Sequence, residues 1–97
     1  MSQYDGATLI QKERQRQIES EVWTPEHDDK HTTFELSRAA VCYVFSVVNI
    51  YSVANWWPWE WNWWKTSSNP IRNLVKAGAL IAAEIDRLQR AAPPAEQ

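Results

Sequence analysis

The chain has 97 residues, with 10 Lys and Arg against 12 Asp and Glu, which fits one small domain and excludes a protein that holds duplex nucleic acid by overall positive charge. Its single cysteine, Cys42, excludes an internal disulfide and a thiolate zinc finger, as expected for a cytoplasmic protein. The first 20 residues contain no apolar segment of the kind that a secretory signal peptide requires.

The first predicted helix covers residues 9 to 21, which contain neither Gly nor Pro. Thr8 followed by Gln11 matches a capping box at its start. Its two isoleucines share a face with Glu13 and Gln17, so this helix places carboxylate and amide groups beside its few buried positions. A fully solvated, charged helix is the alternative interpretation.

Residues 22 to 31 form a polar connection that Trp23 anchors, and Thr24-Pro25 predicts a single helical turn within it. This connection and the start of the next helix hold five potential metal ligands within nine residues: His27, Asp28, Asp29, His31 and Glu35. Carboxylates suit Mg²⁺ or Mn²⁺, and imidazoles shift the preference toward zinc or manganese. In the alternative interpretation the two aspartates cap a helix and the two histidines bond the backbone.

Thr32 followed by Glu35 is a second capping box, and it predicts a long helix that ends near Ala54. Residues 39 to 59 carry no charge, which raises the alternative of a membrane-spanning helix. A polar residue recurs at every third position of this run, and hydrocarbon would penalise such a stripe, so we expect no membrane partner. The stripe consists of Ser46, Asn49, Ser52 and Asn55.

Residues 55 to 65 hold six of the seven tryptophans, and Pro58 near their centre prevents an ordinary helix. Indole offers a large flat apolar surface with one N–H donor, which suits stacking on a base, a protein hot spot or a membrane interface. The sequence therefore predicts an irregular, tryptophan-rich segment that contacts a ligand through Trp57, Trp59 or Trp64.

The last predicted helix begins with Asn69-Pro70 and ends near Arg90. Its apolar residues form one seam, with small residues that permit close approach of a second helix. We expect a homo-oligomer built on this seam, because a domain of this size buries only roughly 60 to 65% of its unfolded surface. The seam consists of Ile71, Leu74, Val75, Gly78, Ile81, Ala82, Ile85 and Leu88.

Arg72 and Lys76 lie in the first two turns of this last helix, near the positive end of its dipole. Together with Lys65 they predict a binding site for an anion such as phosphate. Two solvated bases at the surface are the alternative interpretation.

These elements predict an all-α protein, a small bundle of three main helices with the tryptophan-rich segment between the second and the third. We expect one helical domain over residues 1–90. Residues 91–97 are dominated by Ala and Pro, which predicts a disordered tail.

Six segments of the chain match a set of short motifs. They are Glu-Arg-Gln-Arg-Gln at 13 to 17, Glu-Val-Trp-Thr-Pro-Glu-His-Asp-Asp-Lys-His at 21 to 31, Glu-Leu at 35 to 36, Trp-Pro-Trp at 57 to 59, Trp-Trp-Lys at 63 to 65 and Leu-Val-Lys-Ala-Gly-Ala-Leu-Ile at 74 to 81. Through them the chain resembles, from about Glu13 to Arg90, a family of small phage and prophage proteins without a settled activity. That family usually has glycine where this chain has Val22 and Phe34, a difference that we expect to alter the turn and narrow the site.

The resemblance implies a ligand site in a protein of the host cell cytoplasm. The polar and aromatic motif residues that it assigns to this site are Glu13, Gln17, Trp23, His27, Asp28, Asp29, His31, Glu35, Trp64, Lys65, Arg72 and Lys76.

A more distant similarity is to the all-helical MazG-like nucleoside triphosphate pyrophosphohydrolases, which are small and oligomeric and hold Mg²⁺ with helix-borne carboxylates. Their paired acidic elements are not met here, because Glu35 is followed three residues later by Arg38, and Glu84 by Arg87. This departure disfavours catalysis and leaves nucleotide binding open.

The leading hypothesis is a phage-type protein that binds a nucleotide and sequesters a host immune signalling nucleotide as a counter-defence. An indole would stack on the base, and Lys65, Arg72 and Lys76 would hold phosphate. One alternative is a pyrophosphohydrolase in which Asp28, Asp29 and Glu35 hold Mg²⁺. The other is an inhibitor whose tryptophans bind a host defence protein.

Overall fold

The computed structural model describes residues 3–49 and 53–92, and these residues form helices without any strand. The prediction of an all-α bundle with three main helices and an irregular tryptophan-rich segment is confirmed. The three long helices are α1 (Gly6–Ser20), α3 (Glu35–Val47) and α5 (Pro70–Ala91). The short elements are α2 (Pro25–Asp28), α4 (Val53–Trp56) and the 3₁₀ turn η1 (Trp61–Trp63).

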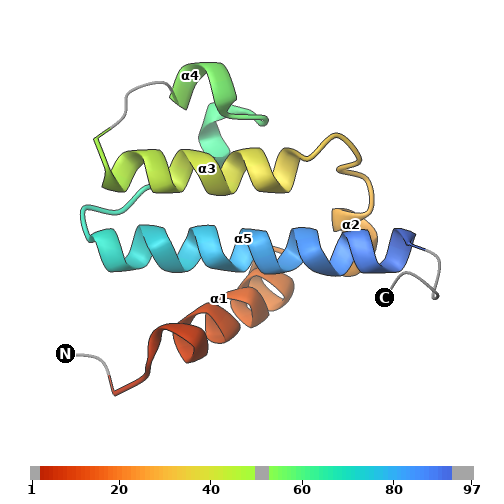
Figure 1. Ribbon diagram of the computed structural model, residues 1–97, viewed down its shortest axis with the longest axis horizontal. Helices are drawn as coiled ribbons and strands as arrows, with labels where there is room; N and C mark the ends of the chain where they lie inside the picture. Colours follow the sequence, from red (N-terminus) through yellow and green to blue (C-terminus); the bar gives the residue numbers. More distant parts are fainter. Residues whose placement is uncertain (1–2, 50–52, 93–97) are drawn as a thin grey trace.

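The helices α3 and α5 lie side by side and antiparallel, and they form the most extensive helix pair of the described chain (Figure 1). α1 crosses α5 on the edge away from α3, and α4 lies beyond α3 (Figure 1). The tryptophan-rich segment connects α4 back to the start of α5. This arrangement brings the end of α1, the short α2 and η1 to one side of the α3–α5 pair.

Side-chain caps fix the starts of α1 and α5. The Thr8 backbone N–H donates to Asp5 Oδ1 at 2.9 Å, so α1 begins about one turn earlier than predicted. The Ile71 backbone N–H donates to Asn69 Oδ1 at 3.0 Å, and Pro70 occupies the first helical position, as the sequence predicts.

The second long helix is shorter than the predicted span from Thr32 to Ala54. It begins only at Glu35, whose carboxylate accepts hydrogen bonds of 2.7 Å from both the N–H and the hydroxyl of Thr33. It ends at Val47, and Asn49 then adopts a left-handed backbone with φ 60°, a common way to terminate a helix. Residues 50–52 of the predicted helix lie outside the described residues.

Small side chains let α3 and α5 approach closely. Leu36 and Leu80 are fully buried, and alanines occupy most of the other contact positions between the two helices. Trp57 closes this core from the tryptophan-rich segment. The buried core residues are Leu36, Ala39, Ala40, Cys42, Tyr43, Trp57, Ala77, Leu80 and Ala83.

The predicted apolar seam of α5 is not the face that packs on α3. Five large residues of that seam are exposed. The face of α5 that is buried instead includes the ion pair of Glu84 and Arg87. On this buried face Arg87 Nη2 donates to Glu84 Oε1 at 2.7 Å, and the Arg87 guanidinium lies 5.8 Å from the Phe34 ring centroid. The exposed residues are Ile71, Leu74, Ile81, Ile85 and Leu88.

None of the helices in the described ranges combines the length and the apolar character that a bilayer span needs. At the other end of the chain, α5 continues to Ala91, one residue into the predicted tail. Residues 93–97 of that tail lie outside the described residues.

Candidate functional site

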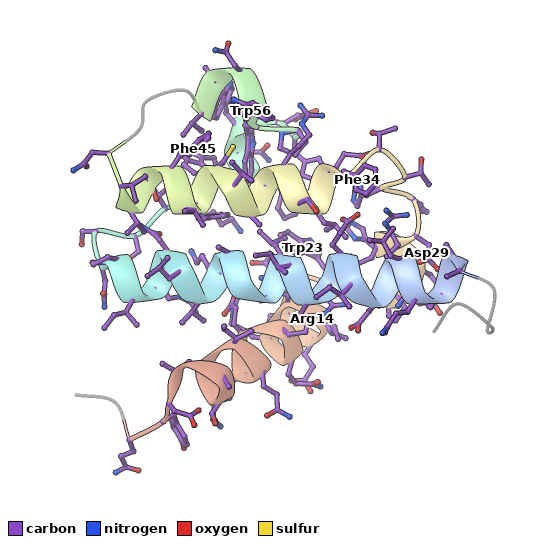
Figure 2. The ribbon with its side chains drawn as sticks, in the orientation of Figure 1. Arg14, Trp23, Asp29, Phe34, Phe45 and Trp56 are labelled. Carbon is purple, nitrogen blue, oxygen red and sulfur yellow. The ribbon has the colours of Figure 1, made fainter. Side chains whose placement is uncertain are left out.

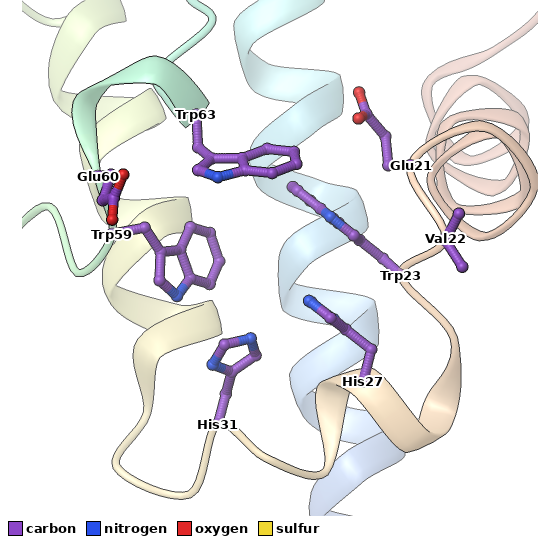
Figure 3. Close-up of a pocket in the computed structure, with 8 residues that line it drawn as sticks. All are labelled: Glu21, Val22, Trp23, His27, His31, Trp59, Glu60 and Trp63. Carbon is purple, nitrogen blue, oxygen red and sulfur yellow. The ribbon is translucent and has the colours of Figure 1, made fainter.

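A pocket of about 390 Å³ lies between the end of α1, α2 and the tryptophan-rich segment (Figure 3). This volume is within the range of small-molecule sites. Three indoles and two imidazoles form most of its wall, and two carboxylates lie at its edge. The lining residues are Glu21, Val22, Trp23, His27, His31, Trp59, Glu60 and Trp63.

The three indoles surround the hollow at steep angles to one another. The ring centroids of Trp23 and Trp59 are 5.8 Å apart with planes inclined by 55°, and those of Trp23 and Trp63 are 6.1 Å apart with planes inclined by 49°. Trp23 is held by its backbone, because its N–H donates to Gln17 O at 3.0 Å and its carbonyl accepts from Arg14 Nη1 at 3.3 Å. The pocket is therefore a concave aromatic surface with a fixed central wall.

Two histidines close the end of the hollow opposite Trp63 (Figure 3). The His27 ring lies parallel to Trp23 at 6.1 Å, and the His31 ring lies 5.0 Å from His27 and 5.2 Å from Trp59. An imidazole offers one donor and one acceptor nitrogen when neutral. The histidines thus add hydrogen-bonding groups to an otherwise apolar wall.

Left-handed backbone at two residues shapes the connections beside the pocket. Val22 has φ 57° and directs the chain from α1 into Trp23, and Phe34 has φ 64° immediately before α3. Side chains with a Cβ rarely adopt this conformation, and a β-branched residue does so least readily. Glycine, the residue that the motif resemblance leads us to expect at these two positions, adopts this conformation without strain.

A cluster of basic side chains adjoins the pocket and shares Glu21 and Trp63 with it. Lys65 Nζ lies 5.2 Å from the Trp63 ring centroid and 3.5 Å from Glu21 Oε1. Lys76 Nζ donates to the Lys65 carbonyl and lies 5.7 Å from the Tyr43 ring centroid. Lys65 therefore links the aromatic pocket to the basic cluster.

Glu13, which is almost fully buried, pairs with two arginines on the side of the cluster away from the pocket. It accepts from Arg16 Nη2 at 2.8 Å and from Arg72 Nη2 at 2.7 Å. Burial raises the pKa of Glu13, but the hydrogen bonds and charges of Arg16 and Arg72 outweigh it and bring the pKa below the usual value. The hydrogen bond to Glu13 in turn raises the pKa of Arg16.

The basic cluster carries an excess of positive charge. Three bases that line it, Arg16, Lys65 and Lys76, face two acids, Glu13 and Glu21, and Arg72 pairs with Glu13 from outside the cluster. Burial lowers the pKa of Lys76, and the positive charges of Arg72, Arg16 and Lys65 lower it further, against the attraction of Glu13. An anion placed here would relieve this repulsion.

Two polar atoms near the site are buried and have no hydrogen-bond partner among the described residues. They are the Trp59 indole nitrogen in the pocket wall and Gln17 Oε1 in the basic cluster. The space within the basic cluster itself is only about 20 Å³. A ligand in the aromatic pocket would therefore reach the cluster from its surface, at Lys65, which is about half exposed.

The structure divides the predicted ligand-binding residues into three groups. Trp23 and Trp59 line the pocket, and Lys65, Lys76, Glu13 and Gln17 lie in the adjoining basic cluster. Arg72 lies on the other side of Glu13, along a surface groove between α1 and α5. Trp57 and Trp64 pack against Tyr43 in the core, with ring centroids 4.8 to 6.0 Å apart, and line neither the pocket nor the basic cluster.

The five predicted metal ligands do not converge. Among the residues that the structure describes, no three His, Cys, Asp or Glu side chains are placed to hold a metal ion together. Asp28 is fully buried and accepts from Arg14 Nη2 at 2.7 Å, and Asp29 accepts from Arg90 Nη2 at 2.7 Å. Glu35 is bonded to Thr33 and lies 3.5 Å from His31 Nδ1, so only the two histidines of the set reach the pocket.

Four residues that line the pocket were not among the predicted site residues: Glu21, Val22, Glu60 and Trp63. Trp63 had a signal, because it precedes Trp64 and Lys65 in one of the motifs. Glu60 has no pattern around it that distinguishes it from a solvated residue.

Comparisons of this chain with protein-family models, curated proteins and solved structures give no significant match.

Proposed function

We propose that this protein binds a small molecule that joins a flat heteroaromatic ring to an anionic group, which is the chemistry of a nucleotide. One observation carries the proposal: a pocket walled by three indoles adjoins a cluster with excess positive charge, and Lys65 lies against Trp63 where the two meet. The aromatic pocket would take the base, and the edge of the basic cluster would take the phosphate.

The base would rest on one indole face rather than between two parallel rings, because the indoles are inclined by about 50°. Stacking on one aromatic side chain is worth roughly 1 to 3 kcal/mol per base. The imidazoles of His27 and His31 offer donors and acceptors for the edge of the base. Apolar faces and edge groups together distinguish a heterocycle from a plain hydrocarbon ring.

The phosphate would bind at Lys65, since its ammonium is about half exposed and, within residues 3–49 and 53–92, is paired with Glu21 alone, at 3.5 Å. Lys76 and Arg16 lie behind Lys65 and would strengthen the local positive potential without direct contact. The predicted role of Arg72 in holding phosphate is not part of this proposal, because Arg72 is paired with Glu13 at some remove from the pocket.

The proposed activity is binding without turnover. Asp28 and Asp29 are engaged by arginines, so the carboxylates on which the pyrophosphohydrolase hypothesis depends have other partners here. Sequestration of a signalling nucleotide in an infected host is the role that the motif resemblance adds to this proposal.

Two exposed indoles outside the pocket support a second candidate, an inhibitor that binds a host defence protein. Trp56 and Trp61 are each about half exposed and line none of the pockets around α1 and α2. Exposed tryptophans are frequent anchors of protein interfaces. A complex recovered from host lysate that is lost in Trp61→Ala and unaffected by nucleotides would favour this candidate over the first.

The proposal is tested by thermal shift and calorimetry with nucleoside mono- and triphosphates, cyclic di- and trinucleotides, free nucleosides and inorganic pyrophosphate. A ligand at a hundredfold its dissociation constant adds about 2.7 kcal/mol, which raises the melting temperature by several degrees. We expect a phosphorylated nucleotide to bind more tightly than its nucleoside and than pyrophosphate. Trp63→Ala and Lys65→Ala should each weaken binding at least tenfold, whereas Trp61→Ala, a tryptophan outside the pocket, should not.

Full retention of binding in both Trp63→Ala and Lys65→Ala would overturn the proposal. Equal affinity for nucleoside and nucleotide would show that the basic cluster does not bind the phosphate. The aromatic pocket would then be the whole of the binding site.

A further inference from the structure

We infer that α3 and α5 together carry one apolar face that packs against the same face of a second copy of this chain, forming a four-helix bundle. The inference is independent of the proposed ligand.

Eight large aliphatic residues on the two helices are between 36% and 60% exposed. Three are valines of α3 or its C-terminal cap, and five are leucines and isoleucines of α5 that stay about half exposed. They are Val41, Val44, Val48, Ile71, Leu74, Ile81, Ile85 and Leu88. Large apolar side chains at this density on two long helices are unusual for a surface that stays in water.

On α3, the exposed valines lie on the side away from the tryptophan-rich segment. Tyr43 contacts Trp64 of that segment, with ring centroids 4.8 Å apart. Val44 follows about 100° further round the helix, and Val41 and Val48 share its stripe, three residues before it and four after.

On α5, the exposed seam lies on that same side. Lys76 faces the Tyr43 ring and the tryptophan-rich segment, and Ala77, about 100° further round, is buried against α3. Leu74 and Ile81 lie beyond Ala77, on the side away from Lys76. α3 and α5 lie side by side (Figures 1 and 2), so their two stripes form one continuous face on the side away from the tryptophan-rich segment.

The area of this face is that of an interface. From their exposed fractions, the eight residues leave on the order of 700 Å² accessible, against about 800 Å² that each partner contributes to a standard interface. A lone apolar patch on a monomer is usually about 300 to 600 Å². None of the eight carries a charge or a polar group that association would have to desolvate.

The spacing on α5 identifies the partner as another helix in the opposite direction. The exposed seam residues Ile71, Leu74, Ile81, Ile85 and Leu88 are separated by three, seven, four and three residues, which keeps them on one face of α5, as in a helix packed along another helix. The Gly78 position between them is covered by Ile10 of α1. A two-fold axis at the centre of the seam sets Ile71 opposite Leu88 and Leu74 opposite Ile85, which a second copy supplies without any new sequence.

The experiment is sedimentation equilibrium of the wild-type chain and three single variants, with far-UV circular dichroism as the folding control. Ile85→Lys and Leu74→Lys place a charge in the face at two separated points, and both side chains are exposed enough in the monomer for the fold to tolerate it. Trp61→Lys changes an equally exposed apolar residue outside the face. We expect a wild-type dimer, a dimer for Trp61→Lys, and at least a hundredfold weaker association for both face variants.

A wild-type chain that remains monomeric at the highest protein concentration measured would overturn the inference and indicate a different occupant of the face. Persistence of the dimer in both face variants would also overturn it, and so would loss of the dimer in Trp61→Lys alone.

Discussion

Single residues in uncommon environments explain much of the site. Val22 and Phe34 hold left-handed backbone at the two connections that flank α2. This conformation costs roughly 1 to 2 kcal/mol for a residue with a Cβ. The fold retains this strained backbone because the chain must turn back toward α1 at Val22. The turn allows the Trp23 N–H to donate to the Gln17 carbonyl of α1.

Replacing Val22 by glycine should therefore stabilise the protein. We expect Val22→Gly to raise the free energy of unfolding by about 1 kcal/mol, because glycine adopts this backbone without strain. Val22→Ala is the matched control, since it shortens the side chain but retains the Cβ, and it should recover only part of this gain. Urea denaturation of the three proteins measures the effect, and a loss of stability in Val22→Gly would contradict the assignment of strain.

The buried Arg14–Asp28 ion pair should contribute far more to the free energy of unfolding than the exposed Arg90–Asp29 pair. Asp28→Asn leaves Arg14 without its carboxylate in a buried site, so we expect a loss of about 3 kcal/mol. Asp29→Asn is the same substitution one residue later in an exposed pair with Arg90, and it should cost at most about 1 kcal/mol. Chemical denaturation distinguishes the two, and equal costs would show that Asp28 is not structural.

At this scale the sequence predicted Trp23 and Trp59 as ligand-binding residues and His27 and His31 as metal ligands, and the structure places all four in the wall of one pocket. The sequence could not separate the tryptophans of the pocket from Trp57, which is buried in the core, or from Trp64, which packs on Tyr43, because an irregular segment has no period that tells its inner from its outer side chains. Asp28 and Asp29 look like metal ligands in sequence, since their arginine partners lie 14 and 61 residues away.

Two contacts between α1 and α5 show how α1 is positioned. Ile10 packs over Gly78, and Glu13 pairs with Arg72. A Cβ built on Gly78 would lie 2.7 Å from Ile10 Cγ1 and closer still to Cδ1. The absence of a side chain at Gly78 thus allows α1 to lie close enough to place Glu13, Gln17 and Trp23.

The Gly78 contact predicts opposite signs for one substitution in two backgrounds. Gly78→Ala in the wild type should destabilise by about 1 kcal/mol, because overpacking against Ile10 exceeds the gain in helix propensity. In an Ile10→Ala background the clash is gone, and Gly78→Ala should stabilise by up to about 1 kcal/mol. A double-mutant cycle in urea measures the coupling, and additive effects would contradict this packing.

Glu13 makes the docking of α1 dependent on pH. Its folded pKa lies below the usual 4.5, so its contribution is present above about pH 4.5 and is lost as pH falls through the lower folded pKa. Glu13→Gln should therefore cost about 2 kcal/mol at pH 7, where two charged hydrogen bonds are weakened. The difference between the wild type and Glu13→Gln should shrink as pH falls below 4.5, and a difference that stays constant down to pH 3 would exclude this linkage.

Helix boundaries were predictable where one strong signal stood alone. Asn69 and Pro70 gave the start of α5, and the end came within one residue of Arg90. The start of α1 was missed because Asp5 caps it in place of Thr8, and both residues are good caps. The end of α3 was missed because a left-handed Asn49 leaves no mark in the apolar pattern.

The whole molecule presents two different faces on the α3–α5 pair. One side holds the aromatic pocket and the basic cluster, and the other is aliphatic and uncharged. The sequence predicted a self-associating seam on α5, but it could not show that valines of α3 extend this seam, because that depends on which helices are neighbours. If both proposals hold, a dimer leaves its two pockets open on opposite outer surfaces.

The most direct measurement is a titration of ¹⁵N-labelled protein with each of the four nucleoside monophosphates and a cyclic dinucleotide, following the seven indole N–H signals by NMR. We predict that at least one of these nucleotides shifts the signals of Trp23, Trp59 and Trp63, while those of Trp56 and Trp61 stay in place. Shifts confined to Trp56 and Trp61, or no shift with any of the five compounds, would contradict nucleotide binding in this pocket.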